Sequence, residues 1–551
     1  MSAGQATGAG QAEAAGQRAG SSWSPFGHRA FVILWVATVV SNIGTWMQNA
    51  AAGWLMTGLN PDPLVVALVQ VATTLPMFLL GLPAGALADI LDKRWLLVAV
   101  NAVLTVLTGG FAILVTMQLV TPVSLLAFTF LFGGGAALIA PAWQAIVPML
   151  VPRQDLPPAV ALNSVGINIS RAVGPALAGI IIGTAGLAAP FWLNALSNLG
   201  VIAGLIWWQP PRATARRLPE ENFRSAVRIG LRHAVNNPHL RATLLRSGGF
   251  FLFASAYWAL LPLVAREQIA GGPELYGILL GAIGAGAVAG AFALPRLKQL
   301  LGADGLVAVG TAGTAIAMVI FGLARDPVTA MIASIVAGLS WIAVLATLNV
   351  SAQVALPSWV RGRGLAVFAI IQFGSMSAGS GLWGQAAGSL GLAAAHFIAA
   401  AALVAAVPLL WRWKLQTGED VDMLPSMHWP APVISGDVAA DRGPVLVTVE
   451  YRVPAQNQRA FLDRMTALEQ ERRRDGAYGW GLYQDAADAQ RFVETFQLSS
   501  WIEHLRQHER VTKADQEQQA RISDLLVPGT SAVVAHLIAP DDQRTAMCAH
   551  R

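Results

Sequence analysis

One arginine lies inside an otherwise apolar stretch of the chain. Arg171 follows Pro158 by 13 residues, which is about 20 Å along a helix that rises 1.5 Å per residue. A charged side chain at that depth in a membrane helix costs about 2.5–3.5 kcal/mol. We therefore expect Arg171 to face a cavity, where its planar set of donors suits an anionic or acceptor-rich ligand. The alternative is a structural arginine that binds neighbouring carbonyl, Asn and Gln oxygens.

Neutral hydrogen-bonding and aromatic side chains recur in the same apolar stretches. Each alone is more typical of a helix-to-helix hydrogen bond, worth about 0.6 kcal/mol, than of a ligand contact. As a set they predict a polar and aromatic cavity around one cation. The candidate cavity residues are Asn42, Gln48, Asn49, Gln70, Gln144, Asn168, Tyr257, Trp258, Asn349, Gln353 and Gln372.

The elements that must hold these side chains come from a duplication of the chain. A shift of 205 residues aligns, without a gap, Gly81 with Gly286, Lys93 with Lys298, Gly133 with Gly338, Gly174 with Gly379, Gly179 with Gly384 and Trp208 with Trp413. Each copy holds six apolar stretches of roughly 20 residues, and each stretch is long enough to cross a hydrocarbon core of about 30 Å. We therefore predict an all-α membrane region with two six-helix parallel repeats, an architecture that places a substrate site between the repeats.

Basic residues favour one side of this membrane region. Alternate loops hold Lys93, Arg94 and an arginine cluster within 212–241, whereas the opposite loops hold Arg266 and Arg325, each beside an acid. This positive-inside pattern places both termini in the cytoplasm. The same distribution, with 55% hydrophobic and 12% charged residues, argues against nucleic-acid binding despite a formal charge of +5.

Composition divides the chain into seven segments. The first is poor in large apolar residues and is expected to be disordered, and an apolar stripe against arginines predicts an amphipathic helix in the linker between the repeats. The division is a cytoplasmic leader at 1–25, an N-terminal six-helix bundle at 26–208, a cytoplasmic linker at 209–241, a C-terminal six-helix bundle at 242–414, a second linker at 415–443, a cytoplasmic α+β domain at 444–540 and a tail at 541–551.

The loop after the second apolar stretch carries a short motif. It resembles the G-x-x-x-D-(R/K)-x-G-R-(R/K) signature of the Major Facilitator Superfamily, and the matching residues are Gly85, Asp89, Lys93 and Arg94. The resemblance implies a role in gating the cytoplasmic side. The match is partial, because Ile90 replaces a basic residue and Asp92 replaces the glycine. Ordinary solvated loop charges are the alternative.

The stretch that holds Arg171 carries a second motif. Gly174, Pro175 and Gly179 resemble the glycine-proline motif in the fifth helix of exporters of this superfamily. The resemblance implies a kinked helix that packs closely on its neighbour, as small residues permit in membranes.

The soluble segment near the C-terminus alternates between strand and helix patterns. Strands are expected at 445–453, 478–484, 491–498 and 531–538, and helices at 455–474 and 501–520. This order predicts a ferredoxin-like α+β unit, and the segment from Phe492 to His508 resembles the antibiotic-biosynthesis monooxygenase-like barrel, which normally pairs into dimers. Trp501, His504 and His508 are its candidate catalytic residues, but the sequence shows no third metal ligand and no nucleophile beside them. We therefore expect no metal, no cofactor and no catalysis there.

The membrane region and the soluble segment together resemble the transmembrane secretion effector branch of the superfamily, which includes enterobactin-type siderophore exporters. The resemblance implies a secondary transporter of a bacterial inner membrane that exports a siderophore-like or drug-like small organic molecule by alternating access. The implied partners are that molecule, membrane lipid and an ion gradient, expected to be of protons, although the apolar stretches hold almost no Asp or Glu. Uptake of a metabolite, and a transporter fused to an active cofactor-independent monooxygenase, are the alternatives.

Overall fold

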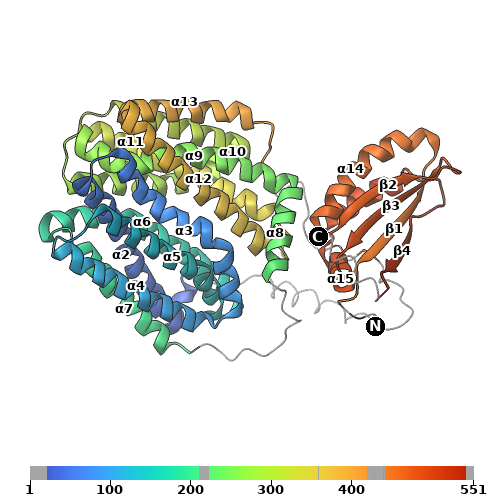
Figure 1. The fold of residues 1–551 in the computed structure, drawn as a ribbon, viewed down its shortest axis with the longest axis horizontal. Coiled ribbons are helices and arrows are strands. Elements are labelled where there is room, and N and C mark those ends of the chain that lie inside the picture. Colours follow the sequence, from blue (N-terminus) through green and yellow to red (C-terminus); the bar gives the residue numbers. More distant parts are fainter. Residues whose placement is uncertain are drawn as a thin grey trace, which may run out of the picture.

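The computed structural model describes residues 22–209, 223–357, 359–417, 426, 428–429, 439 and 441–540. A bundle of long helices lies on one side of the short helix α8, and a small α+β domain lies on the other (Figure 1). The expected leader at 1–25 falls mostly outside the described residues, but Ser24–Gly27 forms a 3-10 turn, η1. The segment 541–551 also lies outside them.

The first half of the bundle has six long helices. They are α2 (Arg29–Leu59), α3 (Pro63–Ile90), α4 (Lys93–Thr116), α5 (Pro122–Ile146), α6 (Leu156–Ala185) and α7 (Ala189–Trp207). Side chains that accept from the first free N–H groups set several of the helix starts. Asp62 accepts from the N–H of Leu64 at the start of α3, and Thr121 forms a capping box with Ser124 at the start of α5.

The second half follows the amphipathic helix α8 (Phe223–Asn236). Its helices are α9 (Pro238–Leu263), α10 (Pro273–Leu323), α11 (Pro327–Val354), α12 (Arg361–Leu390) and α13 (Leu392–Leu410). The described residues include 11 helices long and apolar enough to cross a membrane. One of them, α10, has 51 residues and contains Gly302 at φ 65° and ψ −180°, which breaks the helix. Its two parts therefore count as two of the six apolar stretches expected in the second repeat, and the two-repeat helical architecture is confirmed.

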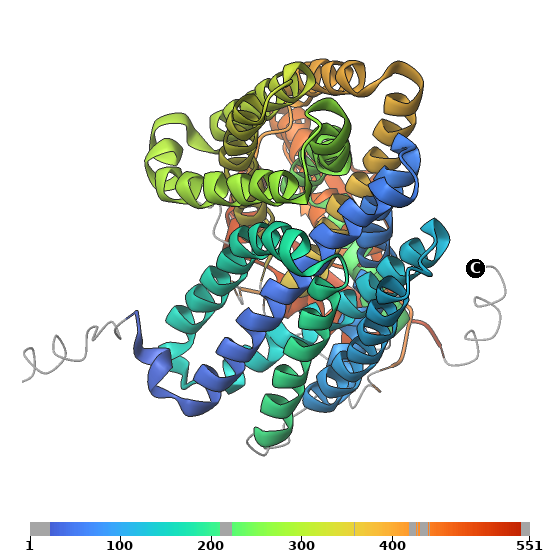
Figure 2. The ribbon, with the colours of Figure 1, turned by 90° about the vertical axis from the view of Figure 1, so that its left-hand side faces the viewer.

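Helices of the two halves pack closely against each other at glycine and alanine residues. Figure 2 looks onto the end of the bundle away from α8 and shows the two groups of helices, blue to teal and green to orange. A Cβ atom at Gly277 of α10 would lie 2.8 Å from the Cα of Gly179 of α6. The equivalent seam joins α12 to α3, where a Cβ at Gly384 would meet the Cβ of Ala67 at 2.5 Å. Small residues thus let α6 approach α10, and α12 approach α3, backbone to backbone.

The C-terminal domain has a four-stranded antiparallel sheet in the order β2-β3-β1-β4. Its elements are β1 (Val445–Arg452), α14 (Gln458–Arg474), β2 (Tyr478–Gln484), β3 (Arg491–Leu498), α15 (Trp501–Arg510), α16 (Lys513–Ser523) and β4 (Val533–Ile538). Alternate residues of β1 are buried, including Val445, Val447 and Val449, and they pack with Phe461 and Met465 of α14. The predicted ferredoxin-like α+β domain is confirmed.

The helix expected at 501–520 is two helices, which corrects that boundary. α15 ends at Arg510, and Thr512 then accepts from the N–H of Asp515 while the Asp515 side chain accepts from the N–H of Thr512. This capping box starts a new helix, since it satisfies donors that a continuous helix would pair internally. The Thr-x-x-Asp spacing is visible in the sequence and is the signal for the break.

The domain contacts the second half of the bundle. Arg232 of α8 donates to the carbonyl of Gly476, and the guanidinium of Arg510 lies 4.5 Å from the ring centroid of Trp359, in the loop between α11 and α12. His233 of α8 lies edge-on to Trp359 at 5.5 Å. Burial first, and then the positive charges of Arg474 and Arg510, lower the pKa of His233 to about 3. This ring is therefore neutral at neutral pH, between the bundle and the domain.

Candidate functional site

A cavity of about 350 Å³ lies between the two halves of the bundle. Helices α2, α3, α5 and α6 of the first half and α9, α10, α11 and α12 of the second half line it. Of the described residues in its wall, Arg171 is the one with a full charge. Neutral polar and aromatic side chains make up much of the rest, among them Thr45, Trp46, Asn49, Gln70, Thr73, Thr74, Phe132, Trp258, Tyr276, Trp341, Gln372 and Phe373.

Arg171 is held from one side by an indole. Its guanidinium carbon lies 5.3 Å from the ring centroid of Trp46, a distance at which the ring face attracts a cation. Gly174 makes room for Trp46, since a Cβ at that position would lie 2.6 Å from the Trp46 Cβ. The Nε of Arg171 is buried without a hydrogen-bond partner. The side chain thus has a donor available for a ligand.

Two prolines interrupt the helical hydrogen bonding in the cavity wall. Pro175 lies inside α6, and Pro262 lies inside α9. Proline has no N–H to donate to the carbonyl four residues earlier, so Pro175 leaves the carbonyl of Arg171, and Pro262 that of Trp258, without its usual helical donor. Both prolines line the cavity. Both carbonyls therefore belong to residues of the wall and lack one helical hydrogen bond.

The second half supplies a group of aromatic rings. Trp258 and Trp341 lie edge to face at 5.5 Å, and the Nε1 of Trp258 is buried without a hydrogen-bond partner. Tyr276 stacks on Trp54 of the first half at 6.0 Å. Aromatic walls bury large apolar area and still present N–H and O–H groups. This arrangement suits a molecule with both flat apolar parts and oxygen acceptors.

Polar and close contacts close the cavity at the end away from α8. Arg266 donates to the Oγ1 of Thr57 at 3.0 Å, and its guanidinium lies 5.4 Å from the ring centroid of Trp54. Gly179 and Gly277 bring α6 and α10 together in the same region. These contacts all join one half to the other, so they have to break if the cavity is to open at that end.

The structure brings five of the candidate cavity residues into the wall and places the others elsewhere. Those in the wall are Asn49, Gln70, Arg171, Trp258 and Gln372. The others are Asn42, Gln48, Gln144, Asn168, Tyr257, Asn349 and Gln353, which corrects the location expected for them.

Local hydrogen bonds and exposure account for most of these corrections. Gln48 is buried and accepts from the Nδ2 of Asn194 at 2.7 Å, whereas Asn168 and Asn349 donate to carbonyls one turn back in their own helices. Gln144 and Gln353 lie exposed near the ends of α5 and α11, and Asn42 is half-buried outside the wall. Tyr257 is fully buried behind the cavity, stacked on Phe321 at 6.1 Å.

One basic residue of the expected gating motif, Arg94, bonds to a neighbouring helix. Arg94 donates through Nε to the carbonyl of Leu205 at 2.7 Å and through another nitrogen to that of Ile206, so it caps the end of α7. Asp92, which replaces the glycine of the motif, caps α4 by accepting from the N–H of Trp95. Gly85 lies within α3 and Lys93 begins α4, while the side chain of Asp89 lies outside the described parts.

An ion pair near the α8 end of the bundle was not expected. Arg246 of α9 and Asp304, just after the break at Gly302, are 2.7 Å apart, and Arg246 is 5% exposed. Asp304 also accepts from the N–H of Leu415. Asp304 and Arg246 are far apart in the sequence, and only the fold shows that this acid reaches a buried arginine of another helix.

Three histidines lie close together in the C-terminal domain, one more than the sequence spacing indicated. His504 and His508 lie on one face of α15, and β4 brings His536 beside them, so a third possible metal ligand is present. Burial and mutual repulsion lower the pKa of His504 to about 3 and that of His508 to about 4, and burial lowers the pKa of His536. All three rings are therefore neutral at neutral pH.

Comparison with protein families and with curated proteins gives consistent matches. A family model described as transmembrane secretion effector matches residues 20–545. The staphyloferrin A transporter of Staphylococcus aureus is 26% identical over 269 residues, which are 47% of this chain and 65% of that protein. The enterobactin exporter EntS of Citrobacter koseri is 26% identical over 301 residues, which are 54% of this chain and 70% of that protein. The match thus spans just under two thirds of the length of the first relative.

Solved structures match the bundle. A bacterial homologue of the iron transporter ferroportin, in an inward-facing state, aligns with a TM-score of 0.56 and 14% identity over 70% of this chain and 98% of that one. A POT family transporter aligns with a TM-score of 0.59 and 12% identity over 70% of this chain and 96% of that one. At these identities the likeness establishes the fold, which is that of two six-helix halves around a cavity.

Proposed function

Because this chain belongs to the transmembrane secretion effector family, a branch of the Major Facilitator Superfamily, we propose that it exports a small, acceptor-rich or anionic organic molecule of the siderophore class. The chain is a multi-pass membrane transporter, and its relatives are transporters. Export is supported by its relatives, which include the enterobactin exporter EntS of Citrobacter koseri.

One observation carries the choice of substrate class. Arg171 is a half-buried cation in the wall of a cavity of about 350 Å³, with its Nε buried and unpartnered and, among the described residues, no carboxylate paired with it. A charge in that position attracts carboxylate or catecholate oxygens and is costly to leave alone. The nearby rings of Trp46, Trp258 and Trp341 would cover the flat parts of such a molecule.

The test is transport by the purified chain in proteoliposomes. An acidic siderophore and a neutral drug-like compound of similar size are compared. Arg171→Ala should abolish transport of the acidic compound while the variant inserts and elutes as wild type, and Arg171→Lys should restore it only in part because the planar fork is lost. The opposite result, equal loss for both compounds in a poorly folded Arg171→Ala variant, would assign Arg171 to structure.

We also propose that both termini face the cytoplasm of a bacterial inner membrane and that a proton gradient drives transport. The charge distribution of the loops supports the orientation. A cysteine at Asn60 should react with an impermeant reagent from outside intact cells, whereas one at Lys93 should not. Pairing of two C-terminal domains stays a prediction, and turnover by the isolated domain would favour the fused-enzyme alternative.

A further inference from the structure

Three histidines of the C-terminal domain meet at one place. His504 and His508 are one turn apart on α15, with ring centroids at 4.8 Å. His536 of β4 is paired with Val447 of β1, and Val447 is buried on the face of the sheet that the helices cover. The centroids of His536 and His504 are 4.5 Å apart. The sheet register, not the sequence spacing, therefore brings the third imidazole to the other two.

The separation of these side chains matches what one metal ion requires. One ring nitrogen of each histidine lies within 4.8 Å of those of the other two. In a tetrahedral zinc site with Zn–N bonds of about 2.0–2.1 Å, ligand nitrogens are about 3.3 Å apart, so each ring has to move by roughly 1 Å. Small side-chain rotations provide such a movement without a change of the backbone.

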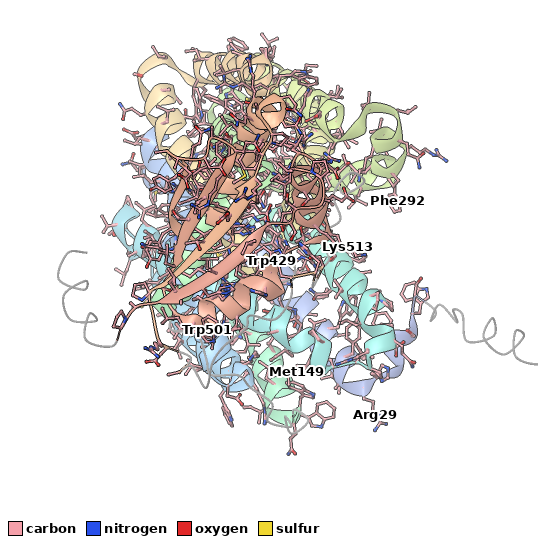
Figure 3. All side chains as sticks on the ribbon, turned by 90° about the vertical axis from the view of Figure 1, so that its right-hand side faces the viewer. Arg29, Met149, Phe292, Trp429, Trp501 and Lys513 are labelled. Carbon is pink, nitrogen blue, oxygen red and sulfur yellow. The ribbon has the colours of Figure 1, made fainter. Side chains whose placement is uncertain are left out.

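His504 lacks partners in the described part of the domain. It is 2% exposed, and both of its ring nitrogens are buried without a hydrogen bond. Trp501 packs on it at 5.2 Å, and Trp429 packs on His508 at 5.1 Å; both tryptophans are labelled in Figure 3. Polar atoms buried in this way cost free energy unless something satisfies them. A bound cation would do so.

We propose that His504, His508 and His536 bind one divalent first-row transition-metal ion. Neutral imidazole nitrogens suit Zn²⁺, Cu²⁺, Ni²⁺ and Fe²⁺, and three protein ligands leave a fourth position for water or another ligand. The nearest strong positive charge is compensated, since Arg472 lies over the ring of Trp429 and pairs with Glu494 at 3.1 Å. This site is separate from the cavity in the bundle and goes beyond the proposed export function.

A group of acids in the same domain is a less suitable site. Glu471, Asp475 and Asp515 also lie within reach of one ion. Arg474, however, pairs with Asp475 at 3.0 Å and with Asp515 at 2.7 Å, and Asp515 caps α16. The oxygens of Asp475 and Asp515 therefore already have cationic and N–H partners. Glu471 accepts from the Nε2 of Gln519, and its other oxygen is buried without a partner. The acids form an ion-pair network, and they serve as the competing location in the test.

The test uses the full-length chain in detergent, purified with a tag that contains no histidine and treated with a chelator. Added Co²⁺ should bind at about one equivalent and show the visible absorption of a tetrahedral nitrogen-ligated site, and Zn²⁺ should displace it. His508→Gln and His536→Gln should each weaken Co²⁺ binding by roughly 100-fold or more, since even the loss of an outer partner costs about 10–100-fold.

Two controls keep the result interpretable. His428→Gln changes a histidine that bonds to Gln519 at 3.1 Å and is outside the three, so Co²⁺ binding should persist. His536 is only partly buried, so His536→Gln should keep the circular dichroism spectrum and metal-free melting temperature of the wild type. A folded wild-type chain that binds no Co²⁺ would overturn the proposal. Binding that survives both His508→Gln and His536→Gln would overturn it too and would point to the acids.

Discussion

The two halves of the bundle share a framework and differ in what they present to the cavity. Arg171 of the first half corresponds, at the shift of 205, to Met376 of the second, and both line the cavity. Trp258 and Trp341 of the second half correspond to Gly53 and Ala136 of the first, and these also line it. The first half therefore supplies the charge together with Trp46 and Phe132, and the second half supplies most of the rings, namely Trp258, Tyr276, Trp341 and Phe373.

The glycines that hold helices together do not show this difference. Gly133 and its equivalent Gly338 both lie against backbone carbonyls of a neighbouring helix, and Gly179 and Gly384 both lie in seams between the halves. The helix packing is therefore equivalent in the two halves, whereas the residues that line the cavity are not. An asymmetric wall can bind a molecule that has one acidic part and one flat part, whereas a symmetric wall would recognise the same group twice.

The largest expected effect comes from moving the charge between halves. Arg171→Met should reduce transport of an acidic substrate by about 10- to 100-fold, because a charged hydrogen bond contributes about 1.5–3 kcal/mol. Arg171→Met with Met376→Arg should recover part of it, since the cation returns to the same cavity from the equivalent position. Met376→Ala is the control and should change little. No recovery in a folded double variant would show that the first half's geometry, not its charge alone, matters.

Gly277→Val tests the shared framework. The added side chain would meet the carbonyl of Pro175 at 2.7 Å and the backbone of Gly179. Overpacking of this kind costs about 1–3 kcal/mol, so the variant should melt at lower temperature in detergent. Gly200→Ala is the matched change, because nothing lies within 4 Å of the added atom. Equal melting of the two variants would contradict the close seam.

His233 makes the junction between α8 and the C-terminal domain sensitive to acid. Its pKa is about 3 in the folded chain against an ordinary 6.5, so its contribution to stability is complete above about pH 6.5 and is lost as the pH falls. Between pH 6.5 and 5 the loss is about 2 kcal/mol, at 1.36 kcal/mol per unit. Limited proteolysis between the bundle and the C-terminal domain should therefore speed up at pH 5. His233→Gln should reduce this pH dependence; an unchanged profile would exclude His233 as its source.

Trp258→Phe should have the smallest effect. The ring remains, but the unpartnered Nε1 donor is lost, which is worth about 0.5–1.5 kcal/mol if the substrate accepts from it. The KM for the acidic substrate should rise by about two- to tenfold, with insertion unchanged. Trp192→Phe, at a residue that is 39% exposed on the bundle, is the control. A KM unaffected by Trp258→Phe would mean that the second half contributes shape rather than hydrogen bonds.

The sequence predicted the helices well because long apolar stretches and a repeat are strong signals. The prediction that Arg171 faces the cavity came only from the free-energy cost of burying a charge in the hydrocarbon core, because a lone charge in a membrane helix has few other favourable locations. Gln48 and Asn49 show the limit, because adjacent residues differ by about 100° around a helix and only one of them reaches the wall. Trp46 and Trp341 were missed because tryptophan is common in membrane helices for other reasons. His536 lies 28 residues beyond His508, and only the sheet register joins them.

The attachment of the C-terminal domain makes the domain follow any movement of the second half. Arg232 of α8 donates to the carbonyl of Gly476, and Arg510 covers Trp359, so the domain is attached to α8 and to the loop between α11 and α12 of the second half. A rotation of that half by a few degrees displaces the far edge of a rigid body more than it displaces the cavity wall. Two fluorophores, one on the domain and one beside Met149 of the first half, would therefore report the motion of the two halves in real time without a label in the binding site.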